Sequence, residues 1–445
     1  MKIKFLGATQ TVTGSCFLLE KGNTKILIDC GMYQGQDLVD KNYDEFDFDP
    51  SQVDYLIVTH AHLDHVGRIP KLIKEGFDGK ILSTGPTKQI APIVLNDSYH
   101  IMEREISSEL LFEKEHIDQS LQQWETVDYN EKIKLNEQFE IRFRESGHIL
   151  GSALVELWSS GNKILFTGDL GNSPAPLLKD PAQINKADYV VMESAYGDRT
   201  HEDQSRRKEL LENVIENTIS SEGTLMIPAF AIERTQELLY ELNSLVENSR
   251  IPKVPIFIDS PMAIKALSVY RDNKQYFDKE ASQLMKQGDD LFKFPGLIFT
   301  ENEYQSKQIN DVQPPKVVVA GAGMSTGGRI LHHEMRYLPD PNSCLLLICY
   351  QVEGTLGREI LEGADKVEIF GKEIPVNAKV KEIGGYSSHA DQSQLLSWLE
   401  TIKEKPKKVF VVQGEAESAE AISQKVRDQL GIETKIPTLG EEIEL

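Results

Sequence analysis

Cysteine is scarce in this chain, which has only four among 445 residues. None of them belongs to a C-x-x-C pair, so the usual spacing of a cysteine-based zinc site is missing. Three of the four lie in apolar runs typical of strands, where a small buried side chain fits. We therefore predict that the cysteines are core residues: Cys16, Cys30, Cys344 and Cys349.

Long apolar runs and an excess of positive charge are also missing. The opening residues, MKIKFLGATQ, turn polar too early for a signal peptide or a membrane span, which predicts a cytoplasmic protein without membrane contact. The 48 Lys and Arg are outnumbered by 70 Asp and Glu, and the net charge is −22. Because nucleic acids are bound by neutralising their phosphates, this balance argues against a general affinity for them. A nucleic-acid substrate would need a local basic cleft.

The length favours two folded units, or one unit that carries a large insertion. Short apolar runs such as KIKFLG, SCFLLE and TKILIDCG, separated by turn residues, predict strands of one sheet. Helical spacing over residues 91–127 predicts helices that cover it. From about residue 199 helix and strand alternate, the pattern of parallel α/β structure. We predict boundaries that give segments 1–198, 199–375 and 376–445, with the middle one as a second domain.

The strongest local signal is a run of three histidines and one aspartate directly after the apolar strand VDYLIV. Residues two apart at a strand end project to the same side, so His60 and His62 can reach one metal. Asp64 and His65, where the chain turns into a helix, would serve another. These ligand types suit Zn²⁺ in a catalytic site. A single histidine is usually a surface or core residue, but chance does not explain this cluster in a chain with ten histidines.

Two further sites fit the same design, namely His148 in SGHILGSA and Asp169 in FTGDLG. Adjacent glycines, Gly147 and Gly168, permit the sharp turns that direct loop ligands to a common centre. A Gly-Asp pair alone is usually only a turn, but behind the histidine cluster we predict that both residues are ligands. Asp169 is the expected bridge, since a carboxylate can bind two ions about 3.5–4 Å apart.

Asp29, at the end of TKILIDCG, has two interpretations. It is either a turn residue at a strand end or a residue beneath the metals that accepts hydrogen bonds from the ligand loop and fixes its geometry. We favour the second interpretation.

A strand followed by H-x-H-x-D-H, a lone histidine and a Gly-Asp pair resembles the metallo-β-lactamase superfamily. This resemblance implies an α/β fold, an αββα sandwich with a dinuclear site at one edge. The α/β segment after Asp169 is similar to the β-CASP branch, whose members mostly cut RNA or DNA. Segments 1–198 and 376–445 would then form the metallo-β-lactamase domain, and 199–375 would be the inserted β-CASP domain. The similarity spans nearly the whole chain.

Further motifs of the branch are matched by Glu193 in VVMESAYGDR and by His389 in GGYSSHADQ. A third motif departs from the pattern, because VVQGE carries Gln413 where the branch usually has a histidine ligand of the second metal. The resemblance therefore implies a weak contact from Gln413 and a weakened second site. The motif AGAGMSTGGRILHH resembles prokaryotic RNA-metabolising members, in which this loop lies beside the substrate backbone. By this resemblance, backbone and charged groups of the loop would bind substrate phosphate: Gly327, Gly328 and Arg329.

The function implied is two-metal, zinc-dependent hydrolysis of RNA phosphodiester bonds, because Zn²⁺ lowers the pKa of water to about 7 and binds the scissile phosphate. Asp64 would be catalytic as well as a ligand, and His389 would protonate the leaving oxygen, oriented by Glu193. The expected partner is single-stranded RNA. Both a monomer and a homodimer are compatible with the sequence. Two alternatives are an RNA-binding relative with a decayed metal site, for which Gln413 is the only support, and a hydrolase of a small ester or thioester. The latter enzymes lack the long insertion.

Overall fold

Two seven-stranded sheets form the core of the first of two units in the chain. The computed structural model describes residues 1–35, 38–104, 110–201 and 206–445. The first unit combines residues 1–200 with 389–445, and the second comprises residues 201–388. All four cysteines are buried, as predicted. Within the described residues, no helix has both the length and the apolar character that a membrane span requires.

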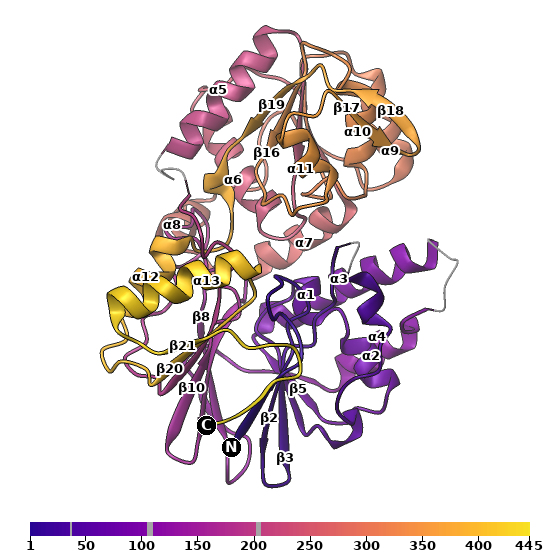
Figure 1. Ribbon diagram of the computed structural model, residues 1–445. Helices are drawn as coiled ribbons and strands as arrows, with labels where there is room; N and C mark the ends of the chain where they lie inside the picture. Colours follow the sequence, from indigo (N-terminus) through magenta and orange to yellow (C-terminus); the bar gives the residue numbers. More distant parts are fainter. Residues whose placement is uncertain (36–37, 105–109, 202–205) are drawn as a thin grey trace. The chain divides into compact units, whose positions relative to one another are not determined.

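The first sheet contains the early strands that the sequence predicts, and its edge strand comes from the end of the chain. Antiparallel pairing of β1 with β22 brings the two termini side by side (Figure 1). In spatial order the strands are β22 (Glu442–Glu444), β1 (Lys2–Phe5), β2 (Phe17–Lys21), β3 (Thr24–Ile28), β4 (Tyr55–Ile57), β5 (Lys80–Ser83) and β6 (Trp124–Thr126). Its helices are α1 (Leu63–Val66), α2 (Ile69–Lys74), α3 (Gly85–Arg104) and α4 (Lys114–Gln122).

The second sheet packs its inner face against the first. In spatial order its strands are β21 (Thr434–Lys435), β20 (Lys408–Val412), β11 (Tyr189–Glu193), β10 (Asn162–Phe166), β9 (Ala153–Ser159), β8 (Glu140–Glu145) and β7 (Lys132–Lys134). The cluster between the sheets includes Phe5, Phe17, Phe143, Phe166 and Phe410. Two further helices, α12 (Gln392–Glu400) and α13 (Ala416–Lys425), lie over its outer face (Figure 1). Their side chains pack there in another apolar cluster. Because both sheets are covered in this way, the first unit is the expected αββα sandwich.

The second unit is built on one parallel sheet of six strands, as the alternating pattern predicts. In spatial order the strands are β14 (Leu297–Phe299), β13 (Ile256–Asp259), β15 (Lys316–Ala320), β12 (Thr224–Pro228), β16 (Cys344–Leu347) and β19 (Lys379–Glu382). Its main helices are α5 (Arg207–Ser220), α6 (Arg234–Glu247), α7 (Pro261–Asp272), α8 (Lys279–Lys286), α9 (Glu303–Gln308), α10 (Ile330–Tyr337) and α11 (Leu356–Leu361). A short hairpin of β17 (Lys366–Ile369) and β18 (Lys372–Pro375) follows.

The chain stays in the second unit until residue 388, beyond the expected boundary at residue 375. The reason is β19, which pairs in parallel with β16 at the edge of the six-stranded sheet. Its sequence KVKE is mostly exposed, so it lacks the apolar run by which a buried parallel strand is recognised. At the other junction, the contacts divide the units at residues 200 and 201, close to the expected boundary at 198.

Candidate metal centre

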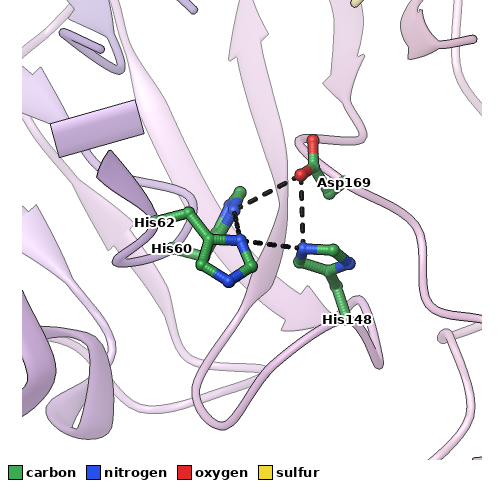
Figure 2. A group of neighbouring side chains, drawn as sticks. All are labelled: His60, His62, His148 and Asp169. Carbon is green, nitrogen blue, oxygen red and sulfur yellow. Dashed lines mark hydrogen bonds and ion pairs between the residues drawn. The ribbon is translucent and has the colours of Figure 1, made fainter. Parts of the chain in front are cut away.

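Three loops that follow strands bring four side chains to one point (Figure 2). His60 and His62 follow β4, His148 follows β8, and Asp169 follows β10. His62 Nδ1 lies 3.1 Å from both His60 Nε2 and His148 Nε2. Asp169 Oδ2 lies 3.4 Å from His60 Nε2 and 3.3 Å from His148 Nε2. Ligands about 2.0–2.1 Å from a tetrahedral zinc are about 3.3–3.4 Å apart, so these four atoms fit the donor set of one such ion.

Protonation in this group also suits a metal. Burial lowers the pKa of His60, His62 and His148, which leaves the imidazoles neutral with a lone pair to donate. Burial alone would raise the pKa of Asp169, but the histidines around it, His65 first among them, hold that pKa well below its ordinary value. Neutral imidazoles and an ionised carboxylate are the forms that bind metal.

A second group of donors lies on the other side of Asp169. His65 Nε2 is 3.3 Å from Asp169 Oδ1 and 3.8 Å from Asp64 Oδ2. Asp169 thus presents Oδ2 to the first group and Oδ1 to the second, which is the arrangement that a bridging carboxylate needs. Three donors from Asp64, His65 and Asp169 are the number that catalytic zinc sites commonly take from the protein.

Gln413 completes this second group from the loop after β20. Its Nε2 donates to Asp169 Oδ1 at 2.6 Å and lies 3.0 Å from His65 Nε2. Its backbone has φ 50°, and its backbone N–H donates to Ala8 O at 2.7 Å, which holds the residue in place. A flip of the amide would present Oε1 instead. That oxygen is neutral and suits harder ions better than zinc, so the residues present fit a second ion less well than the first.

Asp29 lies beneath the second group, buried, and Ser15 Oγ donates to it at 3.2 Å. Its Oδ1 accepts the Thr59 backbone N–H at 2.8 Å, and its Oδ2 accepts Thr59 Oγ1 at 2.8 Å and lies 2.7 Å from His65 Nδ1. A proton on His65 Nδ1 directed at Asp29 leaves Nε2 as the donor to a metal. Thr59 was not singled out in the sequence, although it stands directly before His60.

Asp29→Asn should weaken zinc binding at the second site, to which His65 belongs, about 10–100-fold, because loss of a partner that orients a ligand typically costs that much affinity. The carboxylate that fixes the His65 tautomer is replaced by an amide of the same size. Competition against a chromophoric chelator measures the affinity. Asp49→Asn, a change of an exposed carboxylate at the start of a 3-10 turn, is the matched control. Equal affinities in a folded Asp29→Asn protein and in the control would contradict this role.

His389 and Glu193 form a pair beside the first group. Glu193 is fully buried at the end of β11 and accepts the Leu170 backbone N–H at 2.5 Å. His389 Nδ1 lies 3.2 Å from Glu193 Oε2 and 3.9 Å from Asp169 Oδ2. Burial opposes protonation of His389, but the Glu193 and Asp169 carboxylates outweigh it and raise its pKa to about 9. The contact from Nδ1 to Glu193 fixes the orientation of the His389 ring.

The loop expected to bind phosphate, which contains Gly327 and Gly328, belongs to the second unit. There Arg329 Nη1 donates to Asp259 Oδ1 at 2.7 Å and to Thr300 O at 2.9 Å. Burial would raise the pKa of Asp259, but hydrogen bonds, the one from His333 first, lower it to about 2. The ionised Asp259 carboxylate therefore forms an ion pair with Arg329 and partly neutralises its positive charge. Asp259 was not predicted as a site residue, although it follows the apolar residues of VPIFIDS as the last residue of β13.

Comparison with known proteins agrees with this architecture. Residues 10–215 match the metallo-beta-lactamase superfamily, residues 235–360 the Beta-Casp domain, and residues 373–437 the Zn-dependent metallo-hydrolase RNA specificity domain. A Thermus thermophilus protein named as a ribonuclease is 40% identical over 99% of each chain. A Methanocaldococcus jannaschii RNase J-like protein is 32% identical over 98% of each chain.

More distant proteins are similar over the same length. A transcription termination factor of Methanosarcina mazei, FttA, is 29% identical over 100% of this chain and 72% of its own. A crystal structure of a protein of unknown function from Enterococcus faecalis has a TM-score of 0.58 and 12% identity, covers 100% of this chain and 99% of its own, and supports the fold alone. Taken with the two close relatives, these matches show that the chain belongs to the β-CASP branch of the metallo-β-lactamase superfamily, whose members are metal-dependent hydrolases.

Proposed function

We propose that this chain is a cytoplasmic, zinc-dependent ribonuclease that hydrolyses phosphodiester bonds of single-stranded RNA with two metal sites, the second weaker than the first. The observation that carries the proposal is the spacing of the four donor atoms of His60, His62, His148 and Asp169. The names of the relatives and the match to an RNA specificity domain support RNA as the substrate.

The residues divide into two ligand sets that share one carboxylate. His60, His62, His148 and Asp169 would hold the tight ion. Asp64, His65, Asp169 and a contact from Gln413 would hold the weak one. When bound, zinc supplies a Lewis acid that polarises the phosphate and lowers the pKa of water. Asp29 keeps His65 in the tautomer that can donate from Nε2, through the 2.7 Å contact to Nδ1.

His389 acts as the proton donor to the leaving oxygen in this proposal. Its raised pKa keeps the imidazole protonated at neutral pH, and its side chain is 21% exposed, so a substrate atom can reach it. Glu193 orients the ring through Nδ1 and favours the protonated form. In the second unit, we propose that Gly327, Gly328 and Arg329 contact substrate phosphate mainly through backbone N–H groups, because Asp259 already shares the Arg329 charge.

A second candidate function is RNA binding without cleavage, which only Gln413 in the second group favours. A labelled single-stranded RNA incubated with zinc-loaded protein separates the two functions. We expect cleavage that stops when a chelator is added and returns with zinc, and little cleavage of an unrelated small thioester. Tight RNA binding without cleavage at any zinc concentration would support the binding function instead, and thioester hydrolysis alone would reject both.

Gln413→His should tighten the second site and raise cleavage at limiting zinc, because an imidazole nitrogen is a better zinc ligand than an amide oxygen. In the wild type we expect one tight and one weak ion, with activity stimulated by added Zn²⁺ or Mn²⁺. Metal titration of both proteins, with RNA cleavage followed in the same samples, measures the effect. Gln394→His, on the first turn of α12, is the control for adding a histidine. Two equally tight zinc ions in the wild type, with no gain in Gln413→His, would show that Gln413 does not weaken the site.

A further inference from the structure

Four cations and one tryptophan lie on the outer face of the second sheet, and three of the cations lie 4.3–5.3 Å from the tryptophan ring centroid. They come from neighbouring strands, and together with the ring they form what we call the cation–tryptophan patch: Lys132, Arg142, Arg144, Trp158 and Lys163. On the same face, the apolar cluster of α12 and α13 extends to Leu154 and Leu165, on β9 and β10. The patch occupies the neighbouring part of the face, over β7, β8, the far end of β9 and the start of β10.

A buried carboxylate beneath the patch holds its cations in place. Glu156 is 1% exposed and accepts hydrogen bonds from Arg142 Nε and Lys163 Nζ. Burial would raise the pKa of Glu156, but these two bonds outweigh it and lower the pKa. The carboxylate is therefore ionised. It fixes two of the cations on the outer face before any ligand arrives, which reduces the entropy lost on binding.

Trp158 also holds cations of the patch in place, through cation–π contacts. Its ring centroid is 4.3 Å from Lys132 Nζ, 5.3 Å from Arg142 Cζ and 5.2 Å from Lys163 Nζ. Cations this close to an indole face are attracted by the ring quadrupole. The patch is thus a preformed arrangement of positive charge around a half-buried ring.

Positive charge is in excess here, in contrast to the chain as a whole. The four cations face two carboxylates, Glu156 and Glu140, of which Glu140 pairs with Lys132. The net charge of the whole chain is −22. A local reversal of sign of this kind fits a polyanion, because the remainder of the surface repels it.

One side-chain donor of Arg144 has no acceptor among the described residues. Its Nε is buried and has no hydrogen-bond partner among the described residues, and its Nη1 reaches Glu156 only at 3.9 Å. The Nε is closed to solvent. The Arg144 side chain as a whole is 23% exposed, so an outside ligand can approach its exposed part. A phosphate oxygen is the acceptor that an arginine fork fits best.

Strand β8 connects the patch to a loop of the candidate metal centre. Arg144 is the last but one residue of that strand, and His148, a proposed metal ligand, lies in the loop that follows. From Arg144 the cations continue along β8 to Arg142 and across to Lys132 on β7, which pairs with Arg142. A substrate strand that leaves the metal centre on this side would meet these cations in succession.

We propose that the cation–tryptophan patch binds the phosphate backbone of single-stranded RNA outside the metal centre, as an additional contact for long substrates. The inference rests on the proposed function, because it takes the substrate of that site as the polyanion. It also adds to that function, since it assigns substrate length dependence to surface residues that take no part in the chemistry.

The test uses Lys132→Ala combined with Arg144→Ala, which leaves Arg142 and Lys163 to pair with Glu156. The matched control is Lys2→Ala combined with Lys80→Ala, which also removes two cations, each ion-paired on the first sheet. Affinity for fluorescent RNAs of about 30 and about 6 nucleotides is measured by anisotropy between low and high salt. We expect the long RNA to bind about three- to tenfold more weakly to the patch variant only, with a salt slope smaller by about 0.7 per lost phosphate contact. The short RNA should bind all three proteins alike.

The outcomes separate this inference from the proposed function. Cleavage by the wild type, with equal losses of affinity in the patch variant and the control, would overturn the patch but not the nuclease. Absence of cleavage, with a loss of long-RNA affinity confined to the patch variant, would support the patch and reject the nuclease. Displacement of long RNA from the wild type by polyglutamate as effectively as by unlabelled RNA would assign the patch to acidic peptides and overturn it. Failure of the wild type to bind any RNA would overturn both.

Discussion

His62→Ala should yield a folded protein without tightly bound zinc and without measurable RNA cleavage. His62 Nδ1 is 3.1 Å from two other proposed donor atoms, so the substitution removes one of the four proposed ligands of the tight ion. Loss of a partner that merely orients a ligand costs about 10–100-fold in metal affinity, and loss of the ligand itself should cost more. Elemental analysis after dialysis against buffer with trace zinc measures the metal content.

The control for this substitution is His100→Ala, which removes an exposed histidine on α3 that pairs with Glu103. It should keep zinc and activity at wild-type levels. If the His62→Ala protein retains a full complement of tightly bound zinc, the first group is not where the tight ion is held, and the ligand assignment is wrong.

His389→Ala should slow cleavage by about 10²–10⁴-fold while zinc content stays unchanged, because loss of a general acid typically costs that much in rate. The protonated imidazole is the active form in this role. Activity should therefore be present below the pKa of His389 and fall as the pH rises through it. In His389→Ala the alkaline limb of the pH–rate profile that belongs to this group should disappear. Rates over a pH series at saturating zinc test both points.

Glu193→Gln extends the same test to the partner of His389. Without the carboxylate, the pKa of His389 should fall, and the alkaline loss of activity should begin at a lower pH. His100→Ala again serves as the histidine control. A parallel loss of zinc and activity in His389→Ala would make His389 a metal ligand and would reverse the division of roles proposed here.

The candidate ligands could be predicted because the physics that places them is local. Each follows a strand whose apolar run is visible in the sequence, and residues after strands on one side of a sandwich meet at one edge. His60 and His62 are also adjacent in the chain, so their proximity needs no knowledge of the fold. The parallel α/β insertion was predictable from helix–strand alternation. The early strand runs indicated only one sheet covered by helices, and the αββα sandwich followed from the resemblance to the metallo-β-lactamase superfamily.

Other features depend on contacts between distant segments. Thr59 and Asp29 are separated by the loop between β3 and β4, and only the parallel pairing of these strands brings Thr59 onto the Asp29 carboxylate. The patch depends on strand register, since Glu156 meets Arg142 only because the two pair directly across β8 and β9. A polar edge strand such as β19 also cannot be predicted from hydrophobicity, because it lacks an apolar run. Tertiary pairing decides these features, and sequence patterns do not encode it directly.

The central claim is that this cluster of histidines and carboxylates binds zinc and that RNA hydrolysis depends on it. The measurement that tests it most directly is a zinc titration of metal-free protein, in which bound metal and cleavage of a labelled single-stranded RNA are followed in the same samples. We predict no cleavage without metal, one tightly bound zinc first, and a further rise in cleavage as the weaker site fills. Cleavage of equal rate in the presence of a chelator, or no bound zinc after the metal is added back, would contradict the account.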